Sequence, residues 1–211
     1  MATIEQVVSA VEAGKLKIVA GLVEEALKQG CDAFDILNGM IAAMSVVGEK
    51  FKNEEIFVPE MLVSARAMKS GVEVLKPKLV GDKAVSAGKF IIGTVAGDLH
   101  DIGKNLVGMM VESAGFEVID LGTDVPSEKF VNAAQDNPDC KIVGLSALLT
   151  TTMQSMRETV RALEGANLKS RVRIMVGGAP VTQHFANEIG ADAYAPDAAS
   201  AAQAVKTLLA G

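Results

Sequence analysis

The sequence predicts a chain of two parts, an N-terminal bundle of four helices followed by an α/β domain with a five-stranded parallel sheet. Apolar residues recur at helical spacing through residues 1–80. From residue 89 on, short continuous apolar runs alternate five times with helical stretches, as in a parallel sheet covered on both faces. Residues 76–88 lose the periodicity and collect Gly, Pro and Lys, which is typical of a linker. We therefore expect a helical part with its linker at 1–88 and an α/β domain at 89–211.

Local signals delimit the four helices. Gly14 and Gly30 are expected to end the first two, Asp32 is a plausible N-cap of the third, and Pro59 suits the first turn of the fourth. The predicted helices span residues 3–14, 15–30, 32–51 and 59–79. Short loops between four amphipathic helices favour a small bundle.

Five apolar runs are predicted to be the strands of the second part, at residues 89–97, 116–122, 141–149, 172–180 and 191–197. The helices between and after them are expected at 103–115, 126–137, 150–166, 182–190 and 198–211. Five strands in this alternation favour flavodoxin-like, Rossmann-type winding. That winding places ligands at the carboxyl ends of the strands beside the switch point, here the loops after the first and third strands.

Composition narrows the classes of function. The 211 residues carry a net charge of −6 without a basic stripe, which argues against a nucleic-acid partner. No apolar run is long enough to span a membrane, and the first residues lack the basic start of a secretory signal. Cys31 and Cys140 are far apart and are expected to be reduced structural thiols. These observations predict a cytoplasmic protein without a membrane partner.

The stretch "AGDLHDIGKNLV", residues 96–107, follows the first predicted strand. Asp98, His100 and Gly103 form a D-x-H-x-x-G pattern there. A neutral imidazole binds transition metals well, and a carboxylate two residues away is a plausible partner for its second nitrogen. Gly103 permits close approach of a bulky group.

Two further loops carry small residues at the same predicted edge. The loop after the third strand holds Ser146, Leu148, Thr150 and Thr152, and the loop after the fourth holds Gly177 and Gly178. Taken singly, a loop histidine, a run of helix-capping hydroxyls and a glycine turn are each common structural features. Their joint placement on one sheet edge favours a site.

The metal, if one binds, is expected to arrive inside a cofactor. The only other histidine, His184, lies in a predicted helix, so a protein-only zinc site lacks its usual set of about four ligands.

The stretches "GDLHDIGKNLV", "SALLTTTM" and "GGAPV", in this order, resemble the motifs of the cobalamin-binding family. The segment "VGEKFKNEEIFVPEMLVSARAMKSGVEVLKP" resembles the helical cap that precedes this fold in methionine synthase and in stand-alone corrinoid proteins. The resemblance covers essentially the whole chain.

The resemblance implies roles for particular residues. His100 would replace the dimethylbenzimidazole of the cofactor as the lower axial cobalt ligand, Asp98 would bond its other ring nitrogen, and Thr152 would continue a proton relay. Residues Glu55–Met61 would lie near the upper corrin face. Further cofactor contacts would come from Leu99, Asp101, Ile102, Gly103, Ser146, Leu148, Thr150, Gly177, Gly178, Tyr194 and Ala195.

The implied function is that of a corrinoid methyl carrier, a non-catalytic subunit of a methyltransferase complex. Its cofactor would be cobalamin or a related corrinoid, cycling through methylcobalamin and cob(I)alamin forms. One partner, a substrate-specific corrinoid methyltransferase, would load methyl groups from methanol, a methylamine, a betaine or an aryl methyl ether. A second methyltransferase would pass them to tetrahydrofolate or coenzyme M, and a reductive activase would restore the cofactor.

Three alternatives are weighed against this reading. The small subunit of an adenosylcobalamin mutase shares the sheet and motifs but lacks the helical cap, so residues 1–80 argue against it. A cobalamin-binding sensor or regulatory module normally adds a DNA-binding segment, and this acidic sequence shows none. A flavodoxin would need stacking aromatic residues in these loops, and a phospho-receiver would need an Asp at the end of the third strand, where this chain has "GLSALL".

Overall fold

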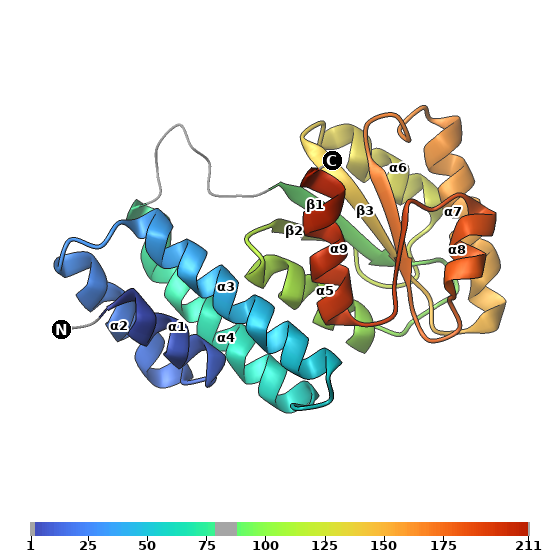
Figure 1. Ribbon diagram of the computed structural model, residues 1–211. Coiled ribbons are helices and arrows are strands. Elements are labelled where there is room, and N and C mark those ends of the chain that lie inside the picture. The colour runs from blue at the N-terminus through green and yellow to red at the C-terminus, as the bar shows by residue number, and fades with distance from the viewer. Residues whose placement is uncertain (1–2, 79–87, 211) are drawn as a thin grey trace. The chain divides into compact units, whose positions relative to one another are not determined.

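A computed structural model describes residues 3–78 and 88–210 of the chain. The described residues form two compact units, a helical one and a sheet-containing one (Figure 1). Most of the linker expected at 76–88, residues 79–87, lies outside the described residues. The boundaries of 1–88 and 89–211 stay predictions.

The helical unit consists of the four predicted helices. They are α1 (Ile4–Glu12), α2 (Leu16–Lys28), α3 (Ala33–Lys52) and α4 (Val58–Leu75), followed by the short 3-10 helix η1 (Lys76–Lys78). Helix α1 packs against α3, and α4 packs against both α2 and α3. The prediction of a four-helix N-terminal part is confirmed.

The sequence signals at the helix ends act as expected. Asp32 caps α3, because its Oδ1 accepts hydrogen bonds from the N–H groups of Phe34 at 2.8 Å and Asp35 at 3.2 Å. Gly14 and Gly30 both adopt positive φ angles after the helices they end. Between the helices the core is rich in methionine, with Met40, Met44, Met61 and Met68 all buried.

The second unit holds a five-stranded sheet in the order β2-β1-β3-β4-β5, with every pair parallel. The strands are β1 (Lys89–Thr94), β2 (Glu117–Asp120), β3 (Cys140–Ser146), β4 (Arg173–Gly177) and β5 (Ala193–Ala195). The helices are α5 (Ile102–Ser113), α6 (Ser127–Asp136), α7 (Met153–Gly165), α8 (Gln183–Ile189) and α9 (Ala198–Ala210), with η2 (Thr150–Thr152) before α7. This is the flavodoxin-like order that the sequence predicts.

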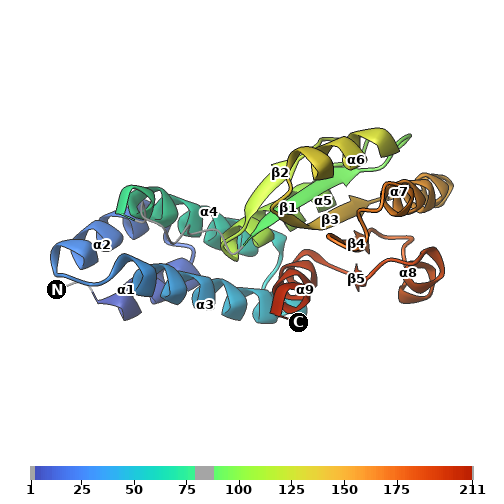
Figure 2. The same cartoon turned by 90° about the horizontal axis from the view of Figure 1, so that it is seen from above.

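Helices cover both faces of the sheet, as the continuous apolar strands predict (Figure 2). Helices α6, α7 and α8 pack side by side on one face, and α5 and α9 lie on the other. Two strand glycines make room for aromatic rings. A Cβ at Gly93 would lie 2.7 Å from the ring of Phe130, and one at Gly144 would lie 2.6 Å from that of Phe90.

The register of the sheet aligns the carboxyl ends of four strands. Thr94 of β1 pairs with Ser146 of β3, Ser146 pairs with Gly177 of β4, and Gly177 pairs with Ala195 of β5. The loops in which the sequence predicts a site therefore leave the sheet at one level. In the described part of the chain, no helix is both long and apolar enough to cross a membrane.

Candidate functional site

The loop between β1 and α5 carries the D-x-H-x-x-G pattern. After Thr94 the chain continues through buried Val95, which forms a parallel bridge with Val125, and turns at Gly97, whose φ is 83°. Asp98 and His100 follow this turn, and α5 begins at Ile102. The short apolar strand thus ends in a tight turn that delivers two titratable side chains to the edge of the sheet.

The carboxylate of Asp98 is fully buried and joins two loops. Its Oδ1 accepts from the N–H of His100 at 3.1 Å and lies 2.8 Å from Nδ1 of the same residue. Its Oδ2 accepts from the N–H of Leu148 at 2.7 Å, the N–H of Leu149 at 3.3 Å and the hydroxyl of Thr152 at 2.8 Å. The loops after β1 and β3 are therefore held together at one side chain.

This environment keeps Asp98 ionised. Burial by itself would raise the pKa of Asp98, since it removes water from the charged form. The hydrogen bonds from Leu148, Thr152 and His100 outweigh burial and hold the pKa far below its ordinary value of 3.8. At neutral pH the carboxylate is an acceptor only.

An ionised Asp98 determines which nitrogen of His100 carries the proton. Because the carboxylate can only accept, Nδ1 of His100 must donate across the 2.8 Å contact. In a neutral ring, Nε2 then has a free lone pair. The His100 side chain is 51% exposed, while its partner is 0% exposed. The ring of His100 is thus held at Nδ1 by the carboxylate, while its Nε2 is free to bind a ligand. This is the arrangement of a metal-ligating histidine with its carboxylate.

Exposed apolar side chains lie on the segments next to His100 and Asp98. In the described sheet unit the exposed large hydrophobic residues are Leu99, Leu148 and Leu149, on the two loops that Asp98 joins, and Ile102, at the start of α5. A Cβ added at Gly103 would have no neighbouring protein atom within 4 Å. Exposed apolar side chains near His100 in the chain and open space at Gly103 suit a large, flat ligand.

Gly177, the last residue of β4 rather than a loop residue, and Gly178 after it have a packing role that the sequence does not reveal. A Cβ at Gly177 would lie 2.8 Å from the carbonyl oxygen of Ala195, and one at Gly178 would overlap the carbonyl oxygen of Ala147. The N–H of Ala147 also donates to the carbonyl of Gly177 at 3.2 Å. Both glycines are thus needed for close approach of neighbouring strand ends, and their role in making room for a ligand stays a prediction.

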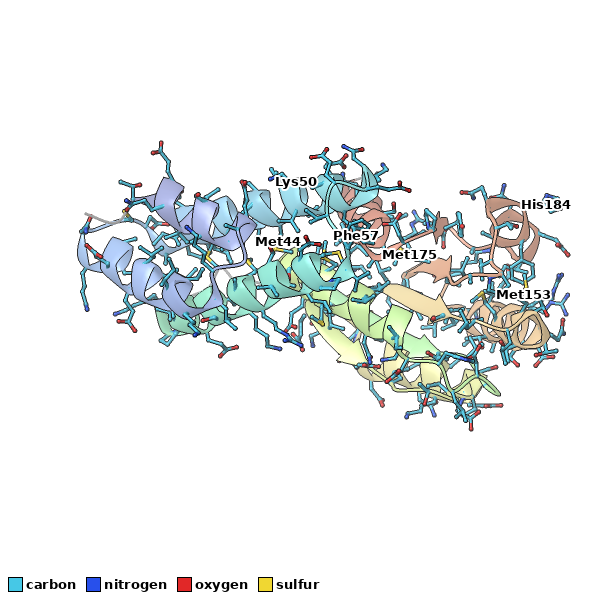
Figure 3. The ribbon with its side chains drawn as sticks, turned by 90° about the horizontal axis from the view of Figure 1, so that it is seen from below. Met44, Lys50, Phe57, Met153, Met175 and His184 are labelled. Atoms are coloured by element: carbon cyan, nitrogen blue, oxygen red, sulfur yellow. The ribbon has the colours of Figure 1, made fainter. Side chains whose placement is uncertain are left out.

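The other residues singled out in the sequence are distributed as follows. Asp101 precedes α5, and its Oδ2 accepts from the side-chain amide of Asn105 at 3.1 Å. Thr150 opens η2, and Tyr194 and Ala195 lie in the edge strand β5. His184 lies on α8, and Figure 3 labels its side chain on that helix. Among the described residues, no group of three or more His, Cys, Asp or Glu side chains is placed to hold a metal ion.

Three residues at this edge were not identified from the sequence. Leu149 is exposed beside Leu148, the hydroxyl of Thr94 donates to the carbonyl of His100 at 2.8 Å, and Asp124 accepts from the N–H of Gly97 at 2.7 Å. The sequence signal of Thr94 is a polar residue at the end of an apolar strand, and that of Asp124 is an Asp in the turn "GTDVP". Both signals are common in proteins without any site.

Comparison with known proteins decides the family. A model described as the B12 binding domain matches residues 88–206, and a second model with the same description matches residues 3–76. This chain belongs to the B12-binding family. Its cofactor is accordingly cobalamin or a related corrinoid, and the resemblance noted in the sequence is confirmed.

Members of this family resemble the chain over nearly its whole length. Dimethylamine corrinoid protein 2 of Methanosarcina mazei is 44% identical over 92% of this chain and 91% of its own. A cobalamin-binding protein from Desulfitobacterium hafniense has a TM-score of 0.83 at 30% identity, covering 99% of both chains. The methanol:cobalamin methyltransferase complex of Methanosarcina barkeri contains a chain with a TM-score of 0.85 at 30% identity, covering 99% of this chain and 80% of that one.

The described residues fit a corrinoid. A corrin supplies four of its own nitrogen ligands to cobalt, so the protein needs to offer one donor and an apolar surface. The edge of the sheet has this composition, with one fixed imidazole and four exposed apolar side chains.

Proposed function

We propose that this B12-binding protein is a methyl carrier in which His100 is the lower axial ligand of the corrinoid cobalt. The observation that carries the proposal is the pairing of His100 with Asp98. Nδ1 is held at 2.8 Å by a buried carboxylate, and Nε2 remains available on a half-exposed ring. When bound, the corrinoid would supply the cobalt that accepts and releases a methyl group.

The residues behind the ring would adjust how firmly it binds the metal. Asp98 withdraws the Nδ1 proton toward Oδ1 and so makes Nε2 a stronger donor. The proton relay that we propose begins with the Nδ1–H of His100 and the carboxylate of Asp98, 2.8 Å apart. The hydroxyl of Thr152, donating to Oδ2, is the third member of this relay.

Other residues of the same edge would contact the cofactor. Leu99, Asp101, Ile102 and Gly103 would lie under the corrin, with Leu148 beside them. The nucleotide tail would run along the strand ends, past Ser146, Thr150, Gly177, Gly178, Tyr194 and Ala195. Support comes from the alignment of Ser146, Gly177 and Ala195 across three neighbouring strands.

The partners we propose are a substrate-specific corrinoid methyltransferase, a second methyltransferase acting on tetrahydrofolate or coenzyme M, and a reductive activase. Relatives named as dimethylamine and trimethylamine corrinoid proteins, and the methanol:cobalamin complex, favour a methylamine or methanol as donor. Residues Glu55–Met61 would lie near the upper corrin face; they include Phe57, a side chain 68% exposed at the turn before α4 (Figure 3). A cytoplasmic location is proposed because both cysteines are free thiols.

The test offers carbon-13-labelled methyl donors to the corrinoid-loaded, reduced chain. Labelled methanol and each methylamine are supplied with their methyltransferases, and methyl iodide, which needs no enzyme, defines complete loading. We expect label to elute with the chain for one donor and to leave it when the acceptor methyltransferase is added. Label that is taken up from methyl iodide but from no enzymatic donor would contradict the carrier function and favour a sensor.

A further inference from the structure

Two side chains outside the D-x-H-x-x-G pattern hold the main chain of the loop that carries His100. The hydroxyl of Thr94 donates to the carbonyl of His100 at 2.8 Å. Oδ1 of Asp124 accepts from the N–H of Gly97 at 2.7 Å, and the N–H of Asp124 donates to the carbonyl of Asp98 at 2.9 Å. The loop is therefore fastened on both sides of the buried carboxylate.

Thr94 is a rigid anchor. It ends β1 with 0% exposure, its N–H donates to the carbonyl of Gly122 at 3.0 Å, and its carbonyl accepts from the N–H of Val125 at 2.9 Å. With its backbone paired to the neighbouring segment, its hydroxyl projects to the far end of the loop. A buried hydroxyl without a partner is costly, so the bond to His100 favours one position of that residue's main chain.

Asp124 holds the near end from the loop between β2 and α6. Its φ of 51° lies in the left-handed region, which Asp and Asn tolerate better than most residues. Val125, which follows Asp124, is held by its bridge to Val95. This unfavourable backbone conformation lets Asp124 bond Gly97 and Asp98 at the same time.

We propose that Thr94 and Asp124 are positioning residues that hold the 97–100 main chain where the His100 ring can reach cobalt. This inference rests on the proposed role of His100 as the lower ligand. With the bonds from Thr94 and Asp124 intact, His100 is fixed at its carbonyl by Thr94 and at its N–H and ring by Asp98. Without the bonds from Thr94 and Asp124, the loop relaxes and the His-off form of the bound corrinoid gains population.

The first test uses the full chain loaded with hydroxocobalamin. The ratio of His-on to His-off corrinoid is read from the visible spectrum over a pH series that includes values where both forms are present. Thr94→Val should lower this ratio about five-fold, which corresponds to about 1 kcal/mol, the net worth of one hydrogen bond. Thr94→Ser, which keeps the hydroxyl, should restore it.

Thr159→Val is the matched control. Thr159 is 1% exposed in α7 of the same unit, and its hydroxyl donates to the carbonyl of Ser155 at 2.8 Å. Its loss should lower the melting temperature as the loss of the Thr94 hydroxyl does, yet leave the ratio unchanged. An equal change of ratio in both variants would overturn the proposal, because general loosening of the unit would then explain it.

A second pair of variants isolates the Asp124 bond and serves if Thr94→Val does not fold. Asp124→Asn keeps both a side-chain oxygen and tolerance of the left-handed backbone, whereas Asp124→Gly keeps only the latter. We expect a lower His-on ratio in the Gly variant alone. In the cofactor-free chain, that variant should also show faster hydrogen exchange at the N–H of Gly97.

The wild type separates failure of the inference from failure of the proposed function. A wild type with no His-on form removes His100 as the ligand, and the proposed function fails with the inference. If the wild type is His-on, and its Thr94→Val and Asp124→Gly variants both fold and keep the wild-type ratio of His-on to His-off corrinoid, only the positioning role of Thr94 and Asp124 is overturned.

Discussion

The two units of the chain place their exposed apolar side chains differently. In the described helical unit these are Leu16, Ile18, Phe34, Val46, Phe57 and Val63, spread over three helices and a turn. In the described sheet unit all four lie on the two loops that Asp98 joins or on the first residue of α5. Exposed apolar residues are ordinary when scattered and informative when gathered around a fixed polar group. Concentration at one edge therefore marks the sheet unit as the one built for a ligand.

The two units also use polar groups differently. In the sheet unit, Asp98 bonds to residues up to 54 positions away. Five hydrogen-bond contacts converge on that carboxylate, whereas in the helical unit the Ser64 hydroxyl makes one long-range bond, to the carbonyl of Glu12 at 3.2 Å, and buried methionines fill the core. Apolar packing carries the helical unit, and a polar network shapes the functional edge of the sheet.

Removing the imidazole of His100 should have the largest effect, and the change should be confined to the cobalt ligand in the sheet unit. We expect His100→Ala to bind cobalamin but to lose its His-on spectrum completely, because no other described histidine lies at this edge. His184→Ala, on α8, is the control and should keep the wild-type spectrum. An unchanged spectrum in His100→Ala would remove this residue from the ligand role.

A core substitution in the helical unit should lower the stability of the protein and leave the spectrum of bound cobalamin unchanged. Met40 is 0% exposed in α3 and packs against Gly71. Met40→Ala should lower the free energy of unfolding by about 3 kcal/mol through the cavity it leaves, and Met40→Leu by about 1 kcal/mol. Denaturant unfolding measures both. The His-on ratio should stay that of the wild type, and a fall in Met40→Ala would break the contrast between the units.

Replacing the central carboxylate should show a pH dependence. In the cofactor-free chain, Asp98→Asn should lower the free energy of unfolding by about 2 kcal/mol at pH 7, since bonds to a charged acceptor are lost. The pKa of Asp98 is lowered on folding, so its stabilisation is complete above the ordinary value of 3.8 and is lost as the pH falls through the folded value. The gap between wild type and variant should narrow in acid.

The control for this variant is Asp136→Asn, at an exposed position of α6. It should stay within about 0.5 kcal/mol of the wild type at neutral pH. A gap between wild type and Asp98→Asn that is constant from pH 7 into strong acid would contradict the ionised state of Asp98.

The smallest expected effect concerns the apolar rim. Leu99 is 75% exposed, so Leu99→Ser should leave the melting temperature of the cofactor-free chain unchanged. Loss of apolar contact should weaken cobalamin binding about five-fold, measured by equilibrium dialysis. Ile18→Ser, at a 47% exposed position of α2, should have less than a two-fold effect. Equal effects of the two substitutions would show that the gathered rim has no special role.

Much of the fold follows from the sequence because it rests on local signals. The helix caps, the glycine stops and the apolar strands are each contained in a few neighbouring residues, and alternation of strands and helices then restricts the topology. The pairing of Asp98 with His100 is local as well, spanning two residues. Thr152 lies 54 residues from Asp98; the strand alternation placed it at the same sheet edge, and only the family resemblance implied its part in a relay.

The remaining site residues depend on register and loop packing. Whether the hydroxyl of Thr94 turns toward His100 is decided by the turn after β1, which spacing does not describe. Asp124 acts through a left-handed backbone in a neighbouring loop. Gly177 and Gly178 are easily noticed in the sequence, but the carbonyl groups that require them belong to other strands.

The most direct measurement uses the chain's two histidines. The protein is grown with nitrogen-15 histidine, loaded with cobalamin, reduced to the cob(II)alamin form and compared with unlabelled protein by electron paramagnetic resonance, in the wild type and in His184→Ala. If His100 binds cobalt, the nitrogen splitting of the axial ligand changes with the label in both proteins. Bound cobalamin whose splitting is absent, or is indifferent to the label, would contradict the assignment of His100 as the cobalt ligand.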